Sequence, residues 1–569
     1  MSIFKLDEMA KFGDVQSVDT STVIIRVSDS DLLSKLQVNH LVVIRSSKVG
    51  RYLIGLVNKI MRKYGDESDL AQGEEIATSD IVKVTLIGTY VEKIGEETDI
   101  FKRTLESVPE ISSECFVLSE KVLSDFMSII SIKNLKDIEQ PLLIGNYTLN
   151  DDAKAWLDGN RLFQRHAVIV GSTGSGKSFT VATIIEQIAQ LKSANAILFD
   201  IHGEYKTIVD SGIQYYKIAS PTDTNTDGVI FLPYWLLTYE EMISMMLDRS
   251  DNNAPNQAMM FSTSVMKWKK DYLSTIGKSD MEASITLDSP IPYHLSSLLQ
   301  ELKDKDEEMV AGARAGSEKQ GAFFGKLTRF IQRLEAKISD KRLNFMFNSD
   351  KSLLEYGYMT DLCKKLMKPA SGTESGVKII DFSEVPSDVL PLMVSLIARI
   401  IFFLQQWTDK SKIHPVAIFC DEAHLYIPQN TTHSAEISSL SSFERIAKEG
   451  RKYGVGLVVI SQRPSEVNRT VLSQSGNFIA MRLTNADDQN VIKKLLPDSL
   501  GDFSDLLPIL DVGEALVVGD ASLLPSRIKV NKPSKEPNSN TLGFWYEWSK
   551  DSAPDNVELA VEALRKQSK

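Results

Sequence analysis

The chain has 569 residues, of which 43% are hydrophobic and 25% are charged, as in ordinary folded proteins of about two to four domains. Its three cysteines (Cys115, Cys363 and Cys420) show no CxxC spacing, which excludes a disulfide scaffold or a zinc ribbon and suits a reducing cytosol. The net charge of −12 excludes a protein whose whole surface attracts nucleic acid, so any DNA partner must meet a local basic lining.

Residues 1–145 alternate short β-rich runs with turn signals, among them STVIIRVSD, HLVVIRSS and DIVKVTLIGTYVE. Short runs separated by Gly, Asp and Ser are typical of a small antiparallel barrel or sandwich. No catalytic grouping stands out in this region. We therefore expect an N-terminal β-barrel that serves as an assembly or docking domain.

The second predicted domain is an α/β core made of residues 146–234 and 371–530. HAVIVG, a helical run and then NAILFD form a strand–helix–strand unit, which requires a parallel sheet. VKIIDF, HPVAIFCDE, VGLVVISQ, NFIAMRL and EALVVGD are apolar without alternation, as strands covered on both faces should be. The predicted fold class is thus α/β, with a RecA-like parallel sheet.

Two further segments complete the predicted organisation. Residues 235–370 have helical periodicity and are expected to form a helical insertion; Lys267, Lys269 and Lys270 around Trp268 indicate a solvated helix face there, with DNA contact as the alternative. Residues 531–569 begin as a linker, KPSKEPNSN, and end in a short helix that is able to dock on a neighbour.

A long apolar run, Val389–Trp407, approaches the length of a membrane-spanning helix. Arg399 lies in its middle, where a charge is costly in a bilayer, and Pro386 and Asp388 precede it as helix-start residues do. We expect a buried core helix, no membrane association and a cytoplasmic location, since the N-terminus also lacks the apolar core of a secretory signal.

The octet from Gly171 to Ser178 matches the pattern GxxxxGK[ST] and lies between an apolar strand and a helix. Glycines let backbone N–H groups surround a phosphate at a helix N-terminus. Lys177 would reach the β- and γ-phosphates, and the Ser178 hydroxyl would bind Mg²⁺. The sequence therefore predicts an ATP and Mg²⁺ site, with these nucleotide-binding residues: Gly171, Ser172, Thr173, Gly174, Ser175, Gly176, Lys177, Ser178 and Phe179.

Hydrolysis also requires a group that activates water. The apolar run VAIFC ends in Asp421-Glu422, which places two carboxylates at the carboxyl end of a predicted parallel strand. Asp421 is expected to hold the Mg²⁺ shell, and Glu422 to orient and polarise the attacking water. Gln462 ends another such strand, where a polar side chain can contact the γ-phosphate.

Other residues near these motifs leave alternatives open. The helix SFERIAKEGRKYG carries Arg445 and Arg451, either of which would reach a γ-phosphate in cis or in a neighbouring subunit; a solvated basic face is the alternative. Arg165, just before the first strand of the core, is equally ambiguous. The string DEAH, ending at His424, also suggests a DEAH-box helicase, but those enzymes place this motif much nearer the P-loop.

Taken together, HAVIVGSTGSGKSFTV, ILFDIHGEY, VAIFCDEAHLYIP and FERIAKEGRKYGVGLVVISQRPSEV resemble the HerA family of the FtsK/HerA branch of P-loop motors. The resemblance implies a homohexamer that translocates double-stranded DNA and works with a separate nuclease or effector, such as a NurA-like nuclease or a sirtuin-like NADase. A ring that mainly assembles a toxic partner, for example in antiphage defence, is the alternative. A conjugation-type or protein-pumping ATPase would normally show membrane segments.

The same resemblance implies roles for particular residues. Arg451, with Arg445 as its rival, would act across the subunit interface, and Gln462 would be the sensor. Asp200 and Glu204 would lie beside the nucleotide. The remaining expected contacts are to a phosphate and to the base, and they come from Arg165, Leu524 and Pro525.

Overall fold

The computed structural model describes residues 3–566 except 28–32, 34–35, 65–77, 93–99, 119, 133–140, 210–211, 313–315, 372–374, 432–433, 497, 523, 540–542 and 552–555. Its internal contacts divide the chain into two units. The first contains residues 1–187, 458–465 and 472–536, and the second contains residues 188–457, 466–471 and 537–569. Each unit is described by itself.

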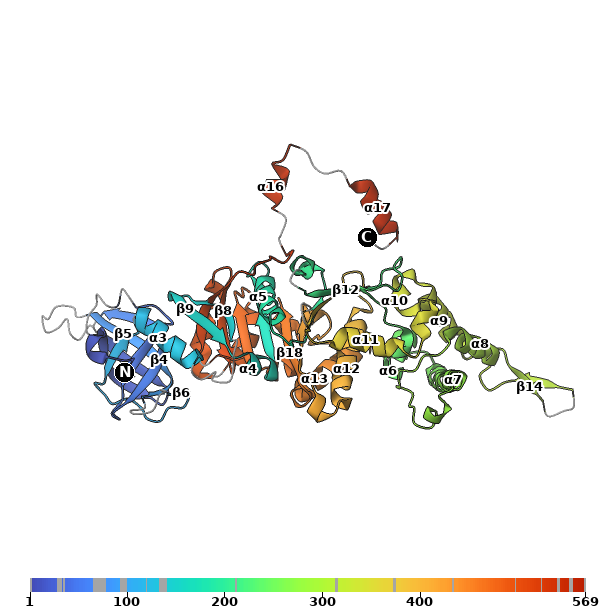
Figure 1. Cartoon of the computed structure of the whole chain (residues 1–569), viewed down its shortest axis with the longest axis horizontal. Helices are drawn as coiled ribbons and strands as arrows, with labels where there is room; N and C mark the ends of the chain where they lie inside the picture. The colour runs from blue at the N-terminus through green and yellow to red at the C-terminus, as the bar shows by residue number, and fades with distance from the viewer. Residues whose placement is uncertain are drawn as a thin grey trace. The chain divides into compact units, whose positions relative to one another are not determined.

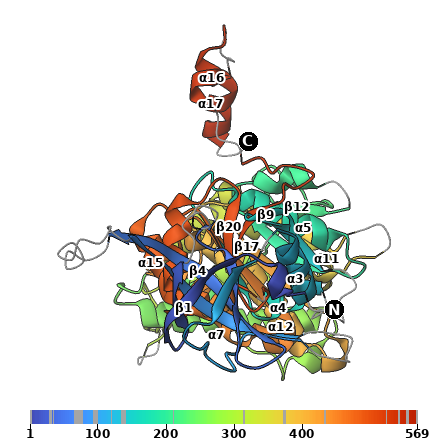
Figure 2. The same cartoon turned by 90° about the vertical axis from the view of Figure 1, so that its left-hand side faces the viewer.

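The first unit begins with a closed antiparallel barrel of six strands (Figure 2). The pairing of β2 with β5 closes it, and the short β6 adds to β5 outside the closed ring. Among the described residues, the strands and the α-helix of this domain are β1 (Lys11–Asp19), β2 (Thr22–Val27), β3 (Leu41–Arg45), β4 (Arg51–Tyr64), β5 (Thr78–Val91), β6 (Ile100–Lys102), β7 (Glu114–Val117) and α3 (Glu120–Ile132). Alternate apolar residues such as Val23, Ile25 and Val84 fill the barrel without exposure, so the predicted barrel is present.

The rest of the first unit is an α/β layer, in which Figure 1 labels β8, β9 and β18. Its strands follow the order β18-β10-β19-β20-β21-β8-β9. The bounds are β8 (Leu142–Tyr147), β9 (Asn150–Leu157), α4 (Gly159–Gln164), β10 (Ala167–Val170), α5 (Lys177–Ala189), β18 (Val455–Ser461), β19 (Asn477–Met481), α15 (Ala486–Leu495), β20 (Glu514–Gly519) and β21 (Ser526–Val530). The central strand β10 pairs in parallel with β18 and β19, as predicted from its continuous apolar run. Strand β8 begins at Leu142, so the predicted domain boundary at residue 145 falls inside a strand.

One predicted parallel strand has the opposite direction. EALVVGD forms β20, which pairs antiparallel with β19, from Asn477↔Gly519 to Met481↔Ala515. An apolar run records burial on both faces but not direction, which depends on how the intervening α15 and following turns return the chain. The sheet is therefore mixed at this edge, with β21, β8 and β9 also antiparallel.

The second unit holds strands in the order β13-β12-β16-β11-β17, all paired in parallel where their registers are described. They are β11 (Ala196–Asp200), β12 (Gln214–Ile218), β13 (Val229–Ile230), β16 (Val377–Asp381) and β17 (Val416–Cys420). The first three residues of β18 also belong to this unit, and its last four belong to the first unit. The expected α/β class with a RecA-like parallel core is therefore present.

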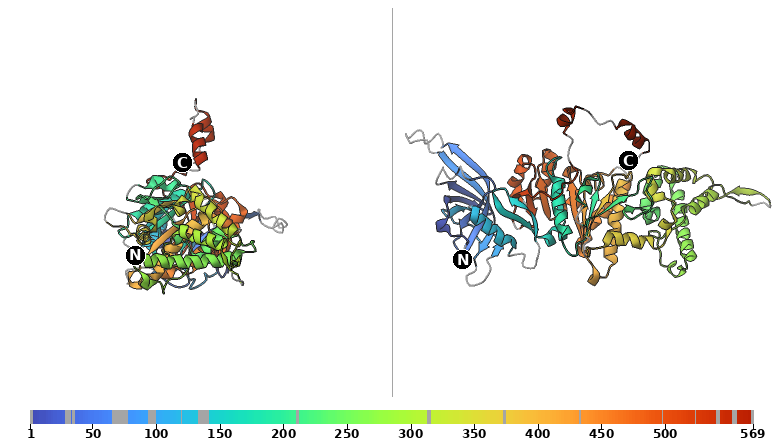
Figure 3. Two further views of the ribbon diagram at one scale, coloured as in Figure 1. Left: turned by 90° about the vertical axis from the view of Figure 1, so that its right-hand side faces the viewer. Right: turned by 45° about the horizontal axis from the view of Figure 1, so that its top comes forward.

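Between β13 and β16 lie the helices of the insertion and a small hairpin, drawn in green and yellow in Figure 3. The elements are α6 (Tyr239–Met246), α7 (Ala254–Thr275), α8 (Leu295–Asp306), β14 (Met309–Ala311), β15 (Glu318–Gln320), α9 (Thr328–Ser339), α10 (Asn344–Phe347) and α11 (Tyr358–Met367). Lys267 of the basic cluster pairs with Glu301 at 2.9 Å, and the indole of Trp268 donates to the same carboxylate. Lys269 is buried and donates to two backbone carbonyls, so these two lysines support the fold.

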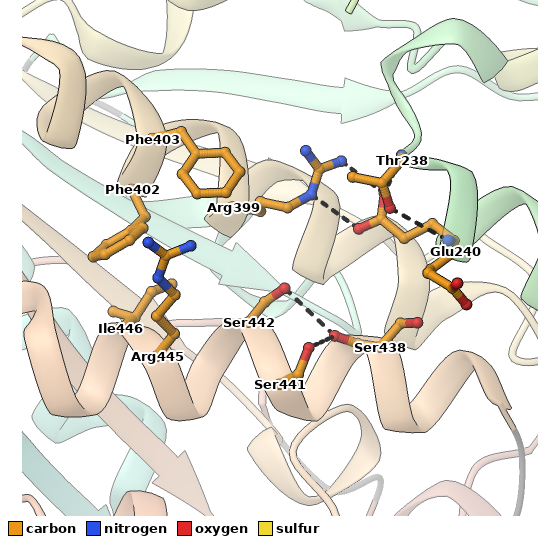
Figure 4. Close-up of a pocket in the computed structure, with 11 residues that line it drawn as sticks. Thr238, Glu240, Arg399, Phe402, Phe403, Ser438, Ser441, Ser442, Arg445 and Ile446 are labelled. Atoms are coloured by element: carbon orange, nitrogen blue, oxygen red, sulfur yellow. Dashed lines mark hydrogen bonds and ion pairs between the residues drawn. The ribbon is translucent and has the colours of Figure 1, made fainter. Parts of the chain in front are cut away.

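The helix that resembles a membrane span is α12 (Leu390–Trp407). Several 3₁₀ turns and α13 (Ser434–Glu449) come later in the chain. Among the described residues it is the one helix long and apolar enough to cross a membrane, and 72% of it is buried inside the protein. Arg399, labelled in Figure 4, lies at the middle of α12. Its Nε and Nη2 donate to the Glu241 carboxylate at 2.9 and 2.7 Å. A buried partner thus accounts for the arginine in a core helix.

Removing one member of this buried pair should destabilise the second unit strongly. Arg399→Met leaves the Glu241 carboxylate, 4% exposed, without its partner, and we expect a loss of about 3–5 kcal/mol in the free energy of unfolding. Urea unfolding followed by circular dichroism measures this loss. Arg249→Met, which removes an exposed ion pair with Glu240, is the control and should cost at most about 1 kcal/mol. Equal effects of the two substitutions would contradict the structural role of the Arg399–Glu241 pair.

Candidate nucleotide-binding site

The glycine-rich loop connects the buried strand β10 to α5, whose first residue is Lys177. Gly174 and Gly176 have φ of +73° and +103°, in the left-handed region that side chains with a Cβ rarely adopt. A Cβ on Gly171 would lie 2.4 Å from the Ser175 hydroxyl, which leaves no room for one. These three glycines let the backbone wrap closely ahead of a helix N-terminus, which is the arrangement that binds a phosphate.

Residues from distant parts of the chain support this loop. The Ser172 N–H donates to the carbonyl of Arg482 at 2.8 Å, just after β19. The Gly513 N–H donates to the carbonyl of Ser175 at 2.8 Å. The Met481 side chain fills the space beside Gly176 and would clash with a larger residue there. No pattern in the sequence indicates these supports, because a methionine, an arginine carbonyl and a glycine at these positions match no motif.

The predicted sensor is in contact with the loop. Gln462 follows β18, the parallel neighbour of β10, and its Oε1 accepts a hydrogen bond of 2.6 Å from the Thr173 hydroxyl. The Gly171 N–H also reaches the Ser461 carbonyl. The structure thus places a neutral amide at the edge of the phosphate loop.

The predicted phosphate and metal ligands lie at the start of α5. Lys177 is 6% exposed, and Ser178 and Phe179 are half-buried beside it. Thr180, in the same turn, donates from its hydroxyl to the Gly176 carbonyl at 3.1 Å, which fixes this first turn to the loop. The glycine cradle, the lysine and the serine hydroxyl are the donor set that a nucleotide phosphate and Mg²⁺ require.

In the second unit, Asp421 and Glu422 directly follow the fully buried β17 and are themselves 2% and 4% exposed. Glu422 has φ +44°, a left-handed conformation that is uncommon for a glutamate and persists only where surrounding structure holds it. The Tyr426 hydroxyl donates to the Asp421 carbonyl at 2.8 Å. His424 Nδ1 lies 3.4 Å from Glu422 Oε2, so the histidine of the DEAH string contacts the glutamate.

The Asp200 side chain is hydrogen-bonded within the loop that follows β11. Its carboxylate accepts hydrogen bonds of 2.8–3.0 Å from the N–H groups of Gly203, Glu204 and Tyr205, and it is fully buried. Burial raises the pKa of the Asp200 carboxyl to about 6, although these N–H groups oppose the rise and nearby Asp381 adds to it. The Asp200 carboxylate therefore stabilises the turn that follows β11. The same turn carries Glu204, the other residue of this block that is expected beside the nucleotide.

The two candidate arginines differ in their surroundings. Arg445, on α13, lies over the rings of Phe402 and Phe403, 5.2 Å from each ring centroid, beside a cavity of about 210 Å³ (Figure 4). Its Nη2 also donates to Gln406 at 3.3 Å. Arg451, in the 3₁₀ turn after α13, is exposed and forms no hydrogen bond or ion pair with any residue that the structure describes.

The remaining predicted nucleotide contacts lie elsewhere in the first unit. Arg165 directly follows α4, and its Nε is 3.6 Å from Asp520 Oδ2. Leu524 is 2% exposed, and its carbonyl accepts hydrogen bonds from the hydroxyls of neighbouring serines. Pro525 lines a small cavity together with barrel residues such as Leu41. In this structure the Leu524–Pro525 segment therefore lies against the barrel.

These elements define a P-loop ATPase with a RecA-like core. Residues 142–401 match the family model described as "Helicase HerA, central domain", and residues 381–532 match "Helicase HerA-like C-terminal". The chain therefore belongs to the HerA helicase family, as the sequence motifs indicated.

Relatives agree with this assignment. The chain is 26% identical over 420 residues to the DNA double-strand break repair helicase HerA of Pyrococcus furiosus, covering 68% of this chain and 69% of that protein. It is 24% identical over 538 residues to a probable helicase of Methanocaldococcus jannaschii, covering 89% of this chain and 92% of that one. Among solved structures, VirB4 of Thermoanaerobacter pseudethanolicus has a TM-score of 0.43 and 16% identity, covering 69% of this chain and 97% of that chain.

Proposed function

We propose that this ATPase is a DNA translocase that couples ATP hydrolysis to movement along double-stranded DNA. The observation that carries the proposal is the glycine cradle with Gln462 hydrogen-bonded to it, in a chain of the HerA helicase family. The HerA relative from Pyrococcus furiosus is named for the repair of DNA double-strand breaks, which supports DNA as the substrate.

In this proposal Arg165 contacts a phosphate of ATP, and the residues of the other motifs have the following roles. The backbone of Gly171–Gly176 and the ammonium of Lys177 hold the phosphates of ATP, with Phe179 flanking them. Ser178 and Asp421 would hold Mg²⁺, which would neutralise charge on the phosphates. The Glu422 carboxylate orients and polarises the attacking water. The hydrogen bond from Thr173 to Gln462 links the proposed sensor, Gln462, to the phosphate loop.

The assembly is also part of the proposal. We infer a cytoplasmic homohexamer in which Arg451 reaches the γ-phosphate bound by a neighbouring subunit. Both arginines are exposed, but the Arg445 guanidinium lies over two phenylalanine rings, whereas Arg451 has no hydrogen bond or ion pair with a described residue. The N-terminal barrel would dock a separate nuclease or effector, of NurA-like or sirtuin-like NADase type, and antiphage defence is one setting that fits such a pair.

DNA should stimulate ATP hydrolysis by the purified protein. A translocase turns over faster on its track, so we expect at least about tenfold stimulation by duplex DNA that declines steeply as salt is raised. Phosphate release measured with and without DNA tests this. The control is Lys177→Ala, which should abolish turnover with and without DNA.

Two results would count against the proposed DNA translocase. ATP turnover that is unchanged by duplex DNA would contradict translocation. A Lys177→Ala ring that still assembles and activates its partner would favour the alternative, a ring scaffold that activates a toxic enzyme.

A further inference from the structure

The turn between β20 and β21, residues 519–522, is held from several sides within the first unit. The Asp520 N–H donates to the carbonyl of Gly476 at 3.2 Å, and the Ala521 N–H donates to Asn477 Oδ1 at 2.7 Å. The Ala521 carbonyl accepts from the Asp158 N–H at 2.9 Å, just ahead of α4. The turn is therefore fixed to both β19 and α4.

The barrel reaches this turn through one arginine. Arg103 directly follows β6, and its Nη2 donates to the carbonyls of Gly519 and Ser522. Its Nη1 lies 3.5 Å from Asp520 Oδ1. A planar guanidinium that contacts two carbonyls and a carboxylate at once holds the turn in a defined position, which a lysine with a single ammonium cannot reproduce.

The other oxygen of the same carboxylate faces the ATPase core. Asp520 Oδ2 lies 3.6 Å from Nε of Arg165, two residues before β10. The backbone beside Arg165 is tied to the turn as well, because Asn477 Nδ2 donates to the carbonyls of Leu162 and His166 while Asn477 Oδ1 accepts from the turn. Strand β10 begins one residue after His166 and leads directly into the phosphate loop.

We propose that Arg103 and Asp520 form a joint through which the N-terminal barrel positions Arg165 and the segment that enters the phosphate loop. Asp520 is a positioning residue, since it acts on the nucleotide through Arg165. The joint gives a partner seated on the barrel a physical route to ATP turnover. This inference rests on the proposed function, in which Arg165 contacts a phosphate.

Steady-state ATP hydrolysis by the full-length protein tests the joint. We expect Asp520→Asn and Arg103→Gln each to raise the KM for ATP by about threefold to fivefold, the scale of a partly exposed charged contact, with little change in kcat. The double variant should be no worse than either single one, because both break the same connection. Asp520→Glu, which keeps the carboxylate, should restore most of the loss.

Matched variants separate the joint from general effects of charge. Asp505→Asn removes another exposed ion pair of the first unit, to Lys493 at 3.2 Å, and should leave the KM unchanged. Thermal unfolding by circular dichroism reports whether each variant folds. If Arg103→Gln does not fold, Arg103→Lys keeps the charge and should still raise the KM, because the ammonium cannot hold both carbonyls.

A wild-type KM in both Asp520→Asn and Arg103→Gln would overturn the joint, as would a double variant whose effect is the product of the single effects. The variant Arg165→Ala then shows whether the joint alone is wrong or the phosphate contact of Arg165 is wrong as well. If Arg165→Ala raises the KM while Asp520→Asn does not, the joint is wrong and the phosphate contact stands. If Arg165→Ala also has a wild-type KM, both the contact and the joint are wrong, while Lys177→Ala still tests the ATPase independently.

Discussion

Glu422→Gln is expected to lower ATP turnover by at least about 100-fold while ATP binding survives. The amide keeps the shape of the side chain but cannot accept a proton from water, and the phosphate loop, which binds the nucleotide, is unchanged. Phosphate release and binding of a fluorescent ATP analogue measure the two effects separately. Because Glu422 is 4% exposed and held next to His424, the isosteric change should preserve the local fold.

The control for this variant is Glu449→Gln, which changes a half-exposed glutamate at the end of α13 and should leave turnover near the wild-type value. Turnover at the wild-type rate in Glu422→Gln would remove this residue from its assigned role. Loss of ATP binding in the same variant would instead indicate that its carboxylate supports the fold of the site.

Arg451→Ala is expected to have the second large effect, a loss of about 1,000-fold in turnover, the scale of an arginine that stabilises charge on a transferring phosphoryl group. Because we assign its action to a neighbouring subunit, an inactive Arg451→Ala subunit still offers an intact phosphate loop. Rings mixed from Arg451→Ala and Lys177→Ala subunits should therefore regain turnover at interfaces where a wild-type arginine faces a wild-type loop. Hydrolysis measured across mixing ratios gives the result.

Arg445→Ala is the matched control, since it removes a guanidinium that lies on Phe402 and Phe403. We expect a loss of stability with at most a small change in turnover per folded ring. A larger loss of turnover in Arg445→Ala than in Arg451→Ala would exchange the two assignments, and a failure of mixing to restore activity would contradict action between subunits.

Much of the fold follows from local patterns in the sequence. Continuous apolar runs predicted β10, β11, β16 and β17, because strands buried on both faces carry apolar residues at successive positions. Short β-rich runs separated by turn residues predicted the barrel. The antiparallel direction of β20 left no such pattern. The closure of the barrel by β2 and β5 likewise depends on a pairing between distant segments, which no local pattern encodes.

Some residues of the candidate site were likewise predicted from the sequence, and others were not. The octet from Gly171 to Ser178 and the Asp421-Glu422 pair were identified from residue types at fixed spacing. Met481 and Gly513, which pack against the phosphate loop, were not, since they act through position alone. The different surroundings of Arg445 and Arg451, six positions apart, arise from the packing of α13 on α12 and required the structure.

In the role that we propose for Glu422, its left-handed backbone makes folding stability and ATP turnover competing demands at this position. Asparagine and glycine adopt that conformation more easily than glutamate, so replacing the residue with either one would relieve strain. Neither replacement could polarise water. A directed-evolution screen for thermal stability alone would therefore favour inactive variants at this position. Engineering of the protein has to select for ATP turnover and thermal stability together.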